Sequence, residues 1–271
     1  MEKIILFDID DTLLFENGYP KNFEAIKKQI SVMKAEGFKF GVCTYRPLAD
    51  SIDIARDYGL DYVAITEGGA TVYTKTADNE FECVNPAESE IELSEYVRAC
   101  VEQYLQSKNI DIEVKNSIIL EQPDCVVVNK NRIHSPTIRF PEILRNEIDS
   151  IMGYLKSIRG FESMAVTKSQ RSGLKIYIQP EGNNKISTID NLFADKSAIL
   201  VTDSEPYTPE HSDAVKIYSV GDKVEFNKYC DKVFPSHGVG ILELLKEERG
   251  ESYEKLWKIG RWFKNCMVWR F

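Results

Sequence analysis

The sequence predicts an α/β protein in which a doubly wound parallel sheet carries an inserted α+β domain. Short apolar runs alternate with helical periodicity over the first third of the chain, and this alternation resumes after residue 182. Between these two regions strand-like runs dominate. We therefore expect a core domain of residues 1–72 and 181–250, an inserted domain of residues 73–180, and an extension of residues 251–271.

Strands and helices alternate strictly in the first third of the chain. Each expected strand is a short apolar run that suits a buried parallel strand. Each expected helix carries apolar residues at helical spacing and is followed by a glycine, Gly37 or Gly59. The expected elements are a strand at 4–7, a helix at 22–36, a strand at 38–43, a helix at 48–58 and a strand at 62–65.

The remaining elements are predicted from the same patterns. Residues 70–84 resemble a hairpin, with Asp78 and Asn79 at its turn. The inserted region is further expected to contain a helix at 88–107, strands at 110–114, 117–120 and 125–128, a helix at 142–156, and strands at 163–167 and 174–179. The core is expected to resume with a helix at 185–193, strands at 198–202 and 216–220, a further helix, and a strand at 232–234.

Composition narrows the class of protein. A chain of 271 residues can bury a large core, and its net charge of −9 disfavours nucleic acid as the main partner. No run approaches the ~20 apolar residues that span a bilayer, and the N-terminus lacks the pattern of a signal peptide. The six cysteines and three histidines are scattered without metal-ligand spacing. We therefore expect reduced thiols and a cytoplasmic location.

The N-terminal strand ends in acidic residues, because Asp8, Asp10 and Asp11 follow the apolar run. Carboxylates are costly to desolvate, and no Lys or Arg lies beside these in sequence, which indicates a cation site. In an extended chain Asp8 and Asp10 project to the same side, roughly 6–7 Å apart. One could attack or hold a metal while the other moves a proton, and spacing alone leaves open which. Alternatively, Asp10, Asp11 and Thr12 form a turn that caps a short helix.

Polar residues also follow the later strands. Thr44 and Arg46 follow the second strand, and Asp203 follows the strand after the helix that begins at Lys185. Ligands of open parallel sheets bind beyond the carboxyl ends of the strands. Acids for a divalent cation, a hydroxyl and a lysine together indicate a site that handles phosphate.

This order of motifs resembles the haloacid dehalogenase (HAD) superfamily of phosphotransferases. The segment at 67–73 resembles the strand that leads into the inserted cap domain of Cof-like members, and the segment at 175–185 resembles the return from that domain to the core. The resemblance covers about residues 1–245 and implies a Rossmann-like core with the large α/β cap of the Cof-like, mannosyl-3-phosphoglycerate phosphatase and phosphomannomutase branch. The matching residues are Asp8, Asp10 and Thr12, then Thr44 with Arg46 and Pro47, then Lys185, and last Asp203.

The resemblance implies a role for each matching residue. Asp8 would be the nucleophile that forms an aspartyl-phosphate, and Asp10 would be the general acid and then the general base. Thr44 would hydrogen-bond the phosphoryl oxygens, and Lys185 would neutralise negative charge. The implied cofactor is Mg²⁺, held by the Asp8 carboxylate, the Asp10 carbonyl and Asp203. Arg46 is a candidate for binding the substrate.

The sequence departs from the family pattern in three places. The fourth motif lacks its usual second acid, since residue 207 is Tyr; Glu205, Glu210 or Asp213 could replace it. A rival placement of this motif uses Asp222 and Glu225, but the segments that follow Asp203 match the family order better. Tyr45 stands where Gly is usual, and Gly68 stands where Asn is usual.

The inserted domain and the extension offer further candidates. Of the cations Lys130, Arg132, Arg139, Lys168 and Arg171, we expect Arg171 to contact substrate, because it lies in a loop that ends in glycine before a strand. Residues 251–271 interleave aromatic and basic side chains, which predicts an amphipathic helix. We expect this helix to pack on its own domain or to contact a second copy or another partner, in preference to the alternative that it binds a membrane surface.

These features together predict a Mg²⁺-dependent phosphatase for a small phosphorylated metabolite, such as a phosphosugar. Two alternatives stay open: a phosphomutase that returns the phosphate to its substrate, and a non-catalytic HAD-like binding protein. The altered fourth motif favours the second alternative, whereas retention of both Asp8 and Asp10 opposes it.

Overall fold

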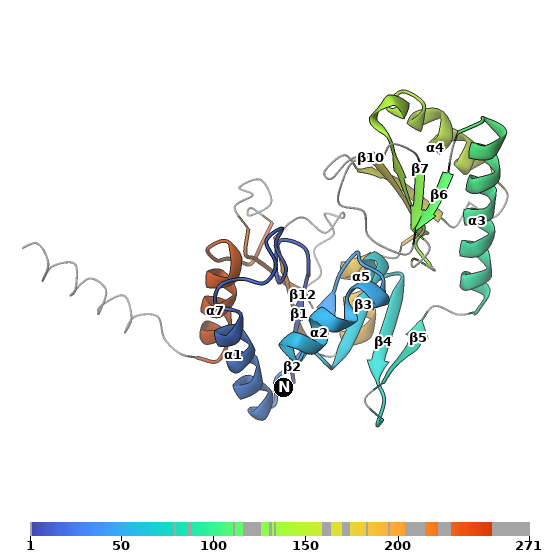
Figure 1. Cartoon of the computed structure of the whole chain (residues 1–271). Coiled ribbons are helices and arrows are strands. Elements are labelled where there is room, and N and C mark those ends of the chain that lie inside the picture. Colours follow the sequence, from blue (N-terminus) through green and yellow to red (C-terminus); the bar gives the residue numbers. More distant parts are fainter. Residues whose placement is uncertain are drawn as a thin grey trace, which may run out of the picture.

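Two β-sheets with their helices make up the described part of the chain (Figure 1). The structure is a computed structural model that describes residues 2–78, 80–85, 88–110, 112–115, 126–129, 132, 134–158, 164–169, 174–182, 184–194, 196–203, 215–221 and 229–250. Within these residues no helix is both long enough and apolar enough to cross a membrane.

The first sheet has the order β13-β12-β11-β1-β2-β3-β4-β5. Its strands run parallel from β13 to β3, and β4 and β5 add an antiparallel edge. Strand β1 lies in the middle, so its carboxyl end is flanked by those of β11 and β2. The strands are β1 (Lys3–Phe7), β2 (Lys39–Cys43), β3 (Val63–Thr66), β4 (Thr71–Lys75), β5 (Phe81–Asn85), β11 (Ser197–Thr202), β12 (Val215–Ser219) and β13 (Lys232–Val233).

Helices cover both faces of the first sheet, as the predicted α/β class requires. Helices α1 (Phe23–Ala35), α2 (Ile52–Tyr58) and α7 (His237–Glu248) bury their apolar side chains against one face of β1. Helix α5 (Lys185–Phe193) packs its apolar side chains on the opposite face. Because successive β1 residues point to opposite faces, this strand is buried on both sides.

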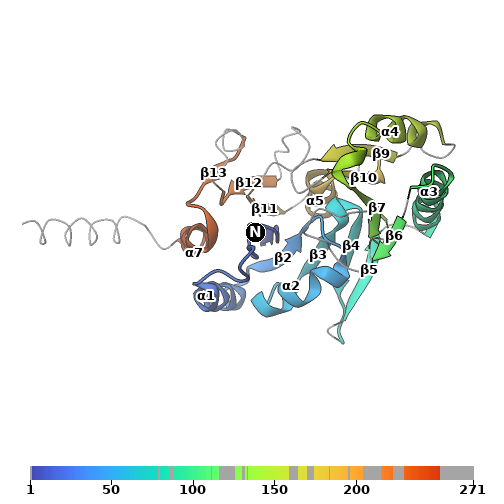
Figure 2. The same ribbon diagram turned by 45° about the horizontal axis from the view of Figure 1, so that its top comes forward.

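The second sheet is smaller and has the order β6-β7-β8-β10-β9. Helices α3 (Glu88–Ser107) and α4 (Ile148–Ser157) pack on the face that is turned away from the first sheet (Figure 2). The apolar side chains of β10, such as Ile176 and Ile178, point toward these helices. Its strands are β6 (Ile112–Lys115), β7 (Val126–Asn129), β8 (Thr137–Phe140), β9 (Met164–Ser169) and β10 (Leu174–Pro180).

The sheets differ from the sequence prediction in two respects. The expected boundary at residue 73 falls inside β4, and both strands of this hairpin hydrogen-bond to the first sheet. Strand β8 was not predicted, because it has only four residues, alternates polar with apolar side chains, and lies between Pro136 and Pro141.

Two expected helices are shorter than predicted. Residues 48–58 divide at Ser51, whose hydroxyl donates to the Pro47 carbonyl, into a 3₁₀ turn and α2. Residues 142–156 likewise divide into the 3₁₀ turn Glu142–Leu144 and α4. The expected strand at 117–120 and the expected helix at 251–271 lie outside the described residues.

Candidate active site

Asp8 directly follows β1 and is fixed by the strand beside it. Its backbone N–H donates to the Val201 carbonyl at 2.8 Å, which extends the β1–β11 ladder by one residue. Its side chain is buried. Oδ1 accepts from the Ile9 N–H at 2.8 Å, and Oδ2 accepts from the Thr202 hydroxyl at 3.3 Å. The carboxylate is therefore held in one orientation by neighbouring strands.

Lys185 lies opposite this carboxylate and forms a buried ion pair with it. The Nζ atom is 2.5 Å from Asp8 Oδ2, and the lysine side chain is 2% exposed. Burial alone would lower the pKa of Lys185, but the charge and hydrogen bond of Asp8, together with the charge of Asp203, outweigh burial and raise this pKa. Lys185 is thus an ammonium. A capping box between Asn184 and Ser187 fixes the helix end that carries it.

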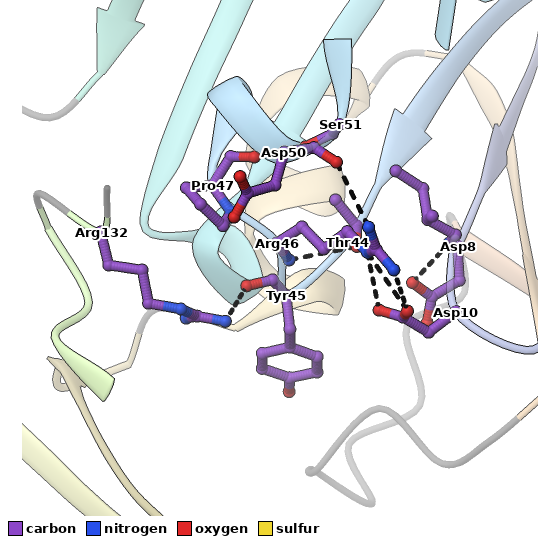
Figure 3. Close-up of polar contacts among 10 residues, drawn as sticks. Asp8, Asp10, Thr44, Tyr45, Arg46, Pro47, Asp50, Ser51 and Arg132 are labelled. Carbon is purple, nitrogen blue, oxygen red and sulfur yellow. Dashed lines mark hydrogen bonds and ion pairs between the residues drawn. The ribbon is translucent and has the colours of Figure 1, made fainter. Parts of the chain in front are cut away.

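Asp10 and Arg46 form a second ion pair beside the first. Figure 3 shows the Arg46 guanidinium pointing from the end of β2 to the Asp10 carboxylate. Its Nη2 lies 2.6 Å from Asp10 Oδ1, and its Nε lies 3.1 Å from Oδ2. The Asp10 side chain is 56% exposed, so this pair is at the surface of the site. Two carboxylates at the sheet edge therefore each have a cation of their own.

Thr44 and Thr12 bring hydroxyl groups to the same edge. Thr44 is buried, its N–H extends β2 by donating to Ile65, and its hydroxyl oxygen accepts from the Arg46 N–H at 3.2 Å. The Thr44 hydroxyl proton can therefore be donated to a further acceptor. The Thr12 hydroxyl is buried and has no hydrogen-bond partner among the described residues.

Asp203 lies just past β11, beside Asp8. It is buried, and its charge contributes to the raised pKa of Lys185. Among the described residues, no three Asp, Glu, His or Cys side chains are grouped so that they alone could hold a metal ion. Two carboxylates and a main-chain carbonyl fit Mg²⁺, which binds through one or two carboxylates and keeps several waters.

Tyr45 and Gly68, the two residues that depart from the family pattern on this side of the site, contact each other. Gly68 has φ +75°, and a Cβ on it would lie 2.7 Å from Cδ1 of the Tyr45 ring. The glycine thus makes space for the tyrosine. The ring lies 4.9 Å from the Lys185 Nζ and 5.8 Å from the ring of Tyr177 on β10. Tyr45 therefore connects the first ion pair with the second sheet.

Two further contacts, which sequence reasoning missed, join the sheets. The Arg132 guanidinium donates to the Tyr45 carbonyl (Figure 3). Glu67 is buried with φ +51°, and its Oε2 accepts from the backbone N–H groups of His134 and Ser135 at 2.9 and 2.5 Å. The only sequence signal for Glu67 was its place at the start of the motif at 67–73.

The structure brings together most of the predicted site residues. Asp8, Asp10, Thr44, Arg46, Lys185 and Asp203 all lie at the carboxyl edge of the first sheet. Burial raises the pKa of the neighbouring Cys43 thiol to about 12, so this cysteine is no rival nucleophile. Outside the described residues are Lys130, Arg171, Glu205, Tyr207, Glu210, Asp213, Asp222 and Glu225.

Comparisons with known proteins give the same fold. A structure of a haloacid dehalogenase-like hydrolase from Bacteroides thetaiotaomicron has a TM-score of 0.64 at 12% identity, covering 91% of this chain and 99% of that one. A Thermoplasma acidophilum protein has a TM-score of 0.62 at 14% identity, with 91% and 98% covered. A HAD subclass IIB sugar phosphatase has a TM-score of 0.58 at 16% identity, with 90% and 98% covered.

The family is shown by sequence as well. A comparison with curated protein sequences finds no significant match. The family model for haloacid dehalogenase-like hydrolases, however, matches residues 5–201, which contain all the described ion-paired residues of the site. The chain belongs to the haloacid dehalogenase-like hydrolases.

Proposed function

We propose that this hydrolase is a Mg²⁺-dependent phosphatase that acts on a small phosphorylated metabolite through an aspartyl-phosphate on Asp8. The observation that carries the proposal is the buried pair of Asp8 and Lys185, 2.5 Å apart. Burying an ion pair gains little stability, so such a pair at a strand end is a candidate for chemistry. A phosphosugar is the favoured substrate, by analogy with the similar sugar phosphatase.

In the first step an oxygen of Asp8 attacks phosphorus, and the bond between phosphorus and the ester oxygen breaks. Asp10 enters this step in its protonated form, after it has left Arg46 and bound a proton from solvent, and it gives this proton to the leaving oxygen. Lys185 neutralises part of the charge on the phosphoryl group, and the Thr44 hydroxyl donates to a phosphoryl oxygen. The fixed orientation of Asp8 favours this attack, because its two oxygens are already held by Ile9 and Thr202.

In the second step water attacks the phosphorus of the aspartyl-phosphate, and Asp10 accepts the proton of that water. Inorganic phosphate leaves, and the Asp8 carboxylate is restored. Asp10 must exchange its contact with Arg46 for substrate or water during each step. The guanidinium released by this exchange is then free to bind a phosphoryl oxygen.

A magnesium ion would be held by the Asp8 carboxylate, the Asp10 carbonyl and Asp203. When bound, the ion supplies positive charge that offsets the charge of the phosphoryl group. Lys185 and the ion would then act on the same group, which suits a transition state with charge spread over three oxygens.

A panel of phosphomonoesters, assayed with Mg²⁺ for release of inorganic phosphate, tests this proposal. Wild-type protein should turn over at least one compound, and Asp8→Asn should abolish the release. Asp11→Asn is the matched control, because Asp11 is an exposed neighbour with φ +54°, a conformation that Asn tolerates. Turnover that survives Asp8→Asn would contradict the mechanism. Rearranged ester without released phosphate would instead identify a phosphomutase.

A further inference from the structure

We infer that the Tyr45 ring determines which leaving groups fit beside Asp8, and that it selects primary phosphoric esters over branched ones. In a primary ester the ester oxygen carries a CH₂ group, whereas in a secondary ester it carries a carbon with two carbon substituents. This inference rests on the proposed phosphatase function and narrows its substrate class. It follows from the position of the ring, the contacts that fix it, and the direction in which the leaving group must point.

The Tyr45 ring lies beside the place where phosphorus would be attacked. Tyr45 directly follows Thr44, whose hydroxyl proton can be donated to a phosphoryl oxygen. Its ring centre is 4.9 Å from the Nζ atom of Lys185, which is itself 2.5 Å from the attacking carboxylate. Figure 3 shows that the ring and the Arg46 guanidinium leave the same segment in different directions, and that the guanidinium points to Asp10. The ring therefore borders the space in front of the first ion pair.

The leaving group must lie alongside this ring. In phosphoryl transfer the attacking and leaving oxygens are roughly in line with phosphorus. Because Asp8 attacks from the carboxyl edge of the first sheet, the ester oxygen points away from that edge and toward the second sheet. The Tyr45 ring extends in the same direction, since its centre lies 5.8 Å from that of the Tyr177 ring on β10. The carbon next to the ester oxygen is therefore placed against the ring.

Hydrogen bonds hold the backbone on both sides of Tyr45. The Thr44 carbonyl, which precedes it, accepts from the Gly68 N–H at 3.0 Å. The Arg46 carbonyl, which follows it, accepts from the Glu67 N–H at 3.0 Å. The Tyr45 carbonyl itself accepts from a guanidinium of the inserted domain. Three consecutive carbonyl groups are thus bonded, so the segment cannot shift without breaking hydrogen bonds.

Contacts also hold the ring itself. A Cβ on Gly68 would lie 2.7 Å from Cδ1 of Tyr45, so the ring fills the space that this glycine leaves. The Lys185 ammonium lies over the ring in a favourable cation–π position, and the Tyr177 ring packs beside it at an angle of 48°. Rotation of the Tyr45 side chain would give up these contacts. A wide leaving group therefore meets a ring that has little room to move.

The size of the leaving group is what such a ring distinguishes. A CH₂ group beside the ester oxygen is narrow, whereas a branched carbon adds a substituent at a position that faces the ring. A single methylene in a closely fitting site changes specificity by about 10–200-fold. Primary and secondary esters carry the same charge, so the ammonium of Lys185 does not distinguish them. The substrate class is therefore a primary phosphoric ester, such as a sugar phosphorylated on its hydroxymethyl group and not at its anomeric carbon.

Isomeric substrate pairs test this inference with the full chain. Glycerol 1-phosphate and glycerol 2-phosphate form one pair, and glucose 6-phosphate and glucose 1-phosphate form another. Each pair compares a primary with a secondary ester of the same composition and charge. In each pair that is turned over, we expect the primary member to have a kcat/KM that is higher by about tenfold or more. Because both isomers are assayed on the same protein, partial unfolding lowers both rates alike and leaves their ratio unchanged.

Tyr45→Ala should reduce this preference to about threefold or less, because it opens the space beside the ester carbon. Tyr45→Phe should keep the preference, because the ring and not its hydroxyl excludes the branch. Tyr104→Ala is the matched control, since Tyr104 is a half-buried tyrosine on α3 that stacks on Tyr154 at 4.2 Å, on the far side of the second sheet. A preference that persists in Tyr45→Ala, or that Tyr45→Phe or the control loses equally, would overturn the assignment.

Calorimetric binding of the same isomers to Asp8→Asn, with and without Tyr45→Ala, separates this inference from the proposed function. Preferential binding of the primary isomer that Tyr45→Ala abolishes, without turnover by the wild type, would support the role of Tyr45 and refute the phosphatase. Turnover without any preference for the primary isomer, in rate or in binding, would support the phosphatase and refute the role of Tyr45. Absence of both turnover and preferential binding would refute both.

Discussion

The two sheets arrange their charged side chains in opposite ways. At the edge of the first sheet each carboxylate has its own cation, as in the pairs Asp8–Lys185 and Asp10–Arg46. On the inner face of the second sheet cations adjoin one another, with Arg139 opposite Lys175. The first sheet therefore holds its ionised groups at this edge as opposite pairs, whereas the second sheet also brings like charges together.

Breaking the buried pair should have the largest effect on stability. Lys185→Met leaves the Asp8 carboxylate buried without its main cation, which should lower the free energy of unfolding by about 3–5 kcal/mol. Denaturant unfolding of both proteins measures the loss. Adding Asp8→Asn to this variant should recover part of it, because no buried charge then lacks a partner. Unchanged stability of Lys185→Met would show that the pair is not buried in solution.

Removing the charge of Lys175 should raise the free energy of unfolding, whereas breaking the buried pair lowers it. Lys175 has a pKa of about 8 instead of 10.5. Below pH 8 Lys175 is charged in both the folded and the unfolded state, so the folded state bears the full cost of burying that charge. Between pH 8 and 10.5 Lys175 is protonated mainly in the unfolded state, so the free energy of unfolding of the wild type rises with pH. Lys175→Gln should therefore be more stable than wild type at neutral pH, by at most about 3 kcal/mol.

This advantage of Lys175→Gln should disappear as the pH rises past the unfolded pKa of lysine. Thermal or urea unfolding between neutral and alkaline pH measures the difference in unfolding free energy between the two proteins. Groups that titrate in both proteins contribute equally and do not affect this difference. A variant that is less stable than wild type at neutral pH would show that the favourable contacts of Lys175 outweigh the cost of its burial beside Arg139.

Disturbing the contact between Gly68 and Tyr45 should have a smaller effect on the free energy of unfolding. Gly68→Asn places a side chain against the Tyr45 ring, at a φ of +75° that Asn accepts better than most residues. We expect a loss of about 1–3 kcal/mol. In a Tyr45→Ala background the same change should cost less, and a double-mutant cycle of unfolding free energies measures this coupling. Additive effects would show that the two residues are independent.

Breaking the exposed pair of Asp10 and Arg46 should have the smallest effect on stability. Arg46→Gln removes the partner of an Asp10 side chain that is 56% exposed, so the free energy of unfolding should change by less than about 1 kcal/mol. Its effect should instead be on KM for a phosphomonoester, which we expect to rise roughly tenfold through loss of a charged contact. A change in stability as large as that of Lys185→Met would contradict the distinction between buried and exposed pairs.

The sequence predicted the residues at the edge of the first sheet better than those that lie on the second sheet. Asp8, Thr44 and Asp203 each follow an apolar run, and parallel strands bring their carboxyl ends to one edge whatever their exact register. Lys185 could be placed by the helix it begins. These predictions needed only the type and order of the helices and strands, which the strong hydrophobic periodicity of the sequence indicates.

The positions of residues on the second sheet depend on information that periodicity does not contain. Arg139 lies on a four-residue strand between two prolines, which was too short to recognise. Its position opposite Lys175 is set by antiparallel register, and a shift of one residue would turn both side chains to the other face. Tyr45 and Gly68 were noted as separate departures, because their contact exists only in the folded chain.

The central claim is that Asp8 carries the phosphoryl group during turnover. Rapid acid quench of the wild-type protein with a turned-over phosphomonoester, followed by peptide mass spectrometry, measures this directly. We expect a transient phosphate on the peptide that contains Asp8, present in Asp11→Asn and absent in Asp8→Asn. Phosphate release in which no protein-bound phosphate forms, or a label on a different residue, would contradict it.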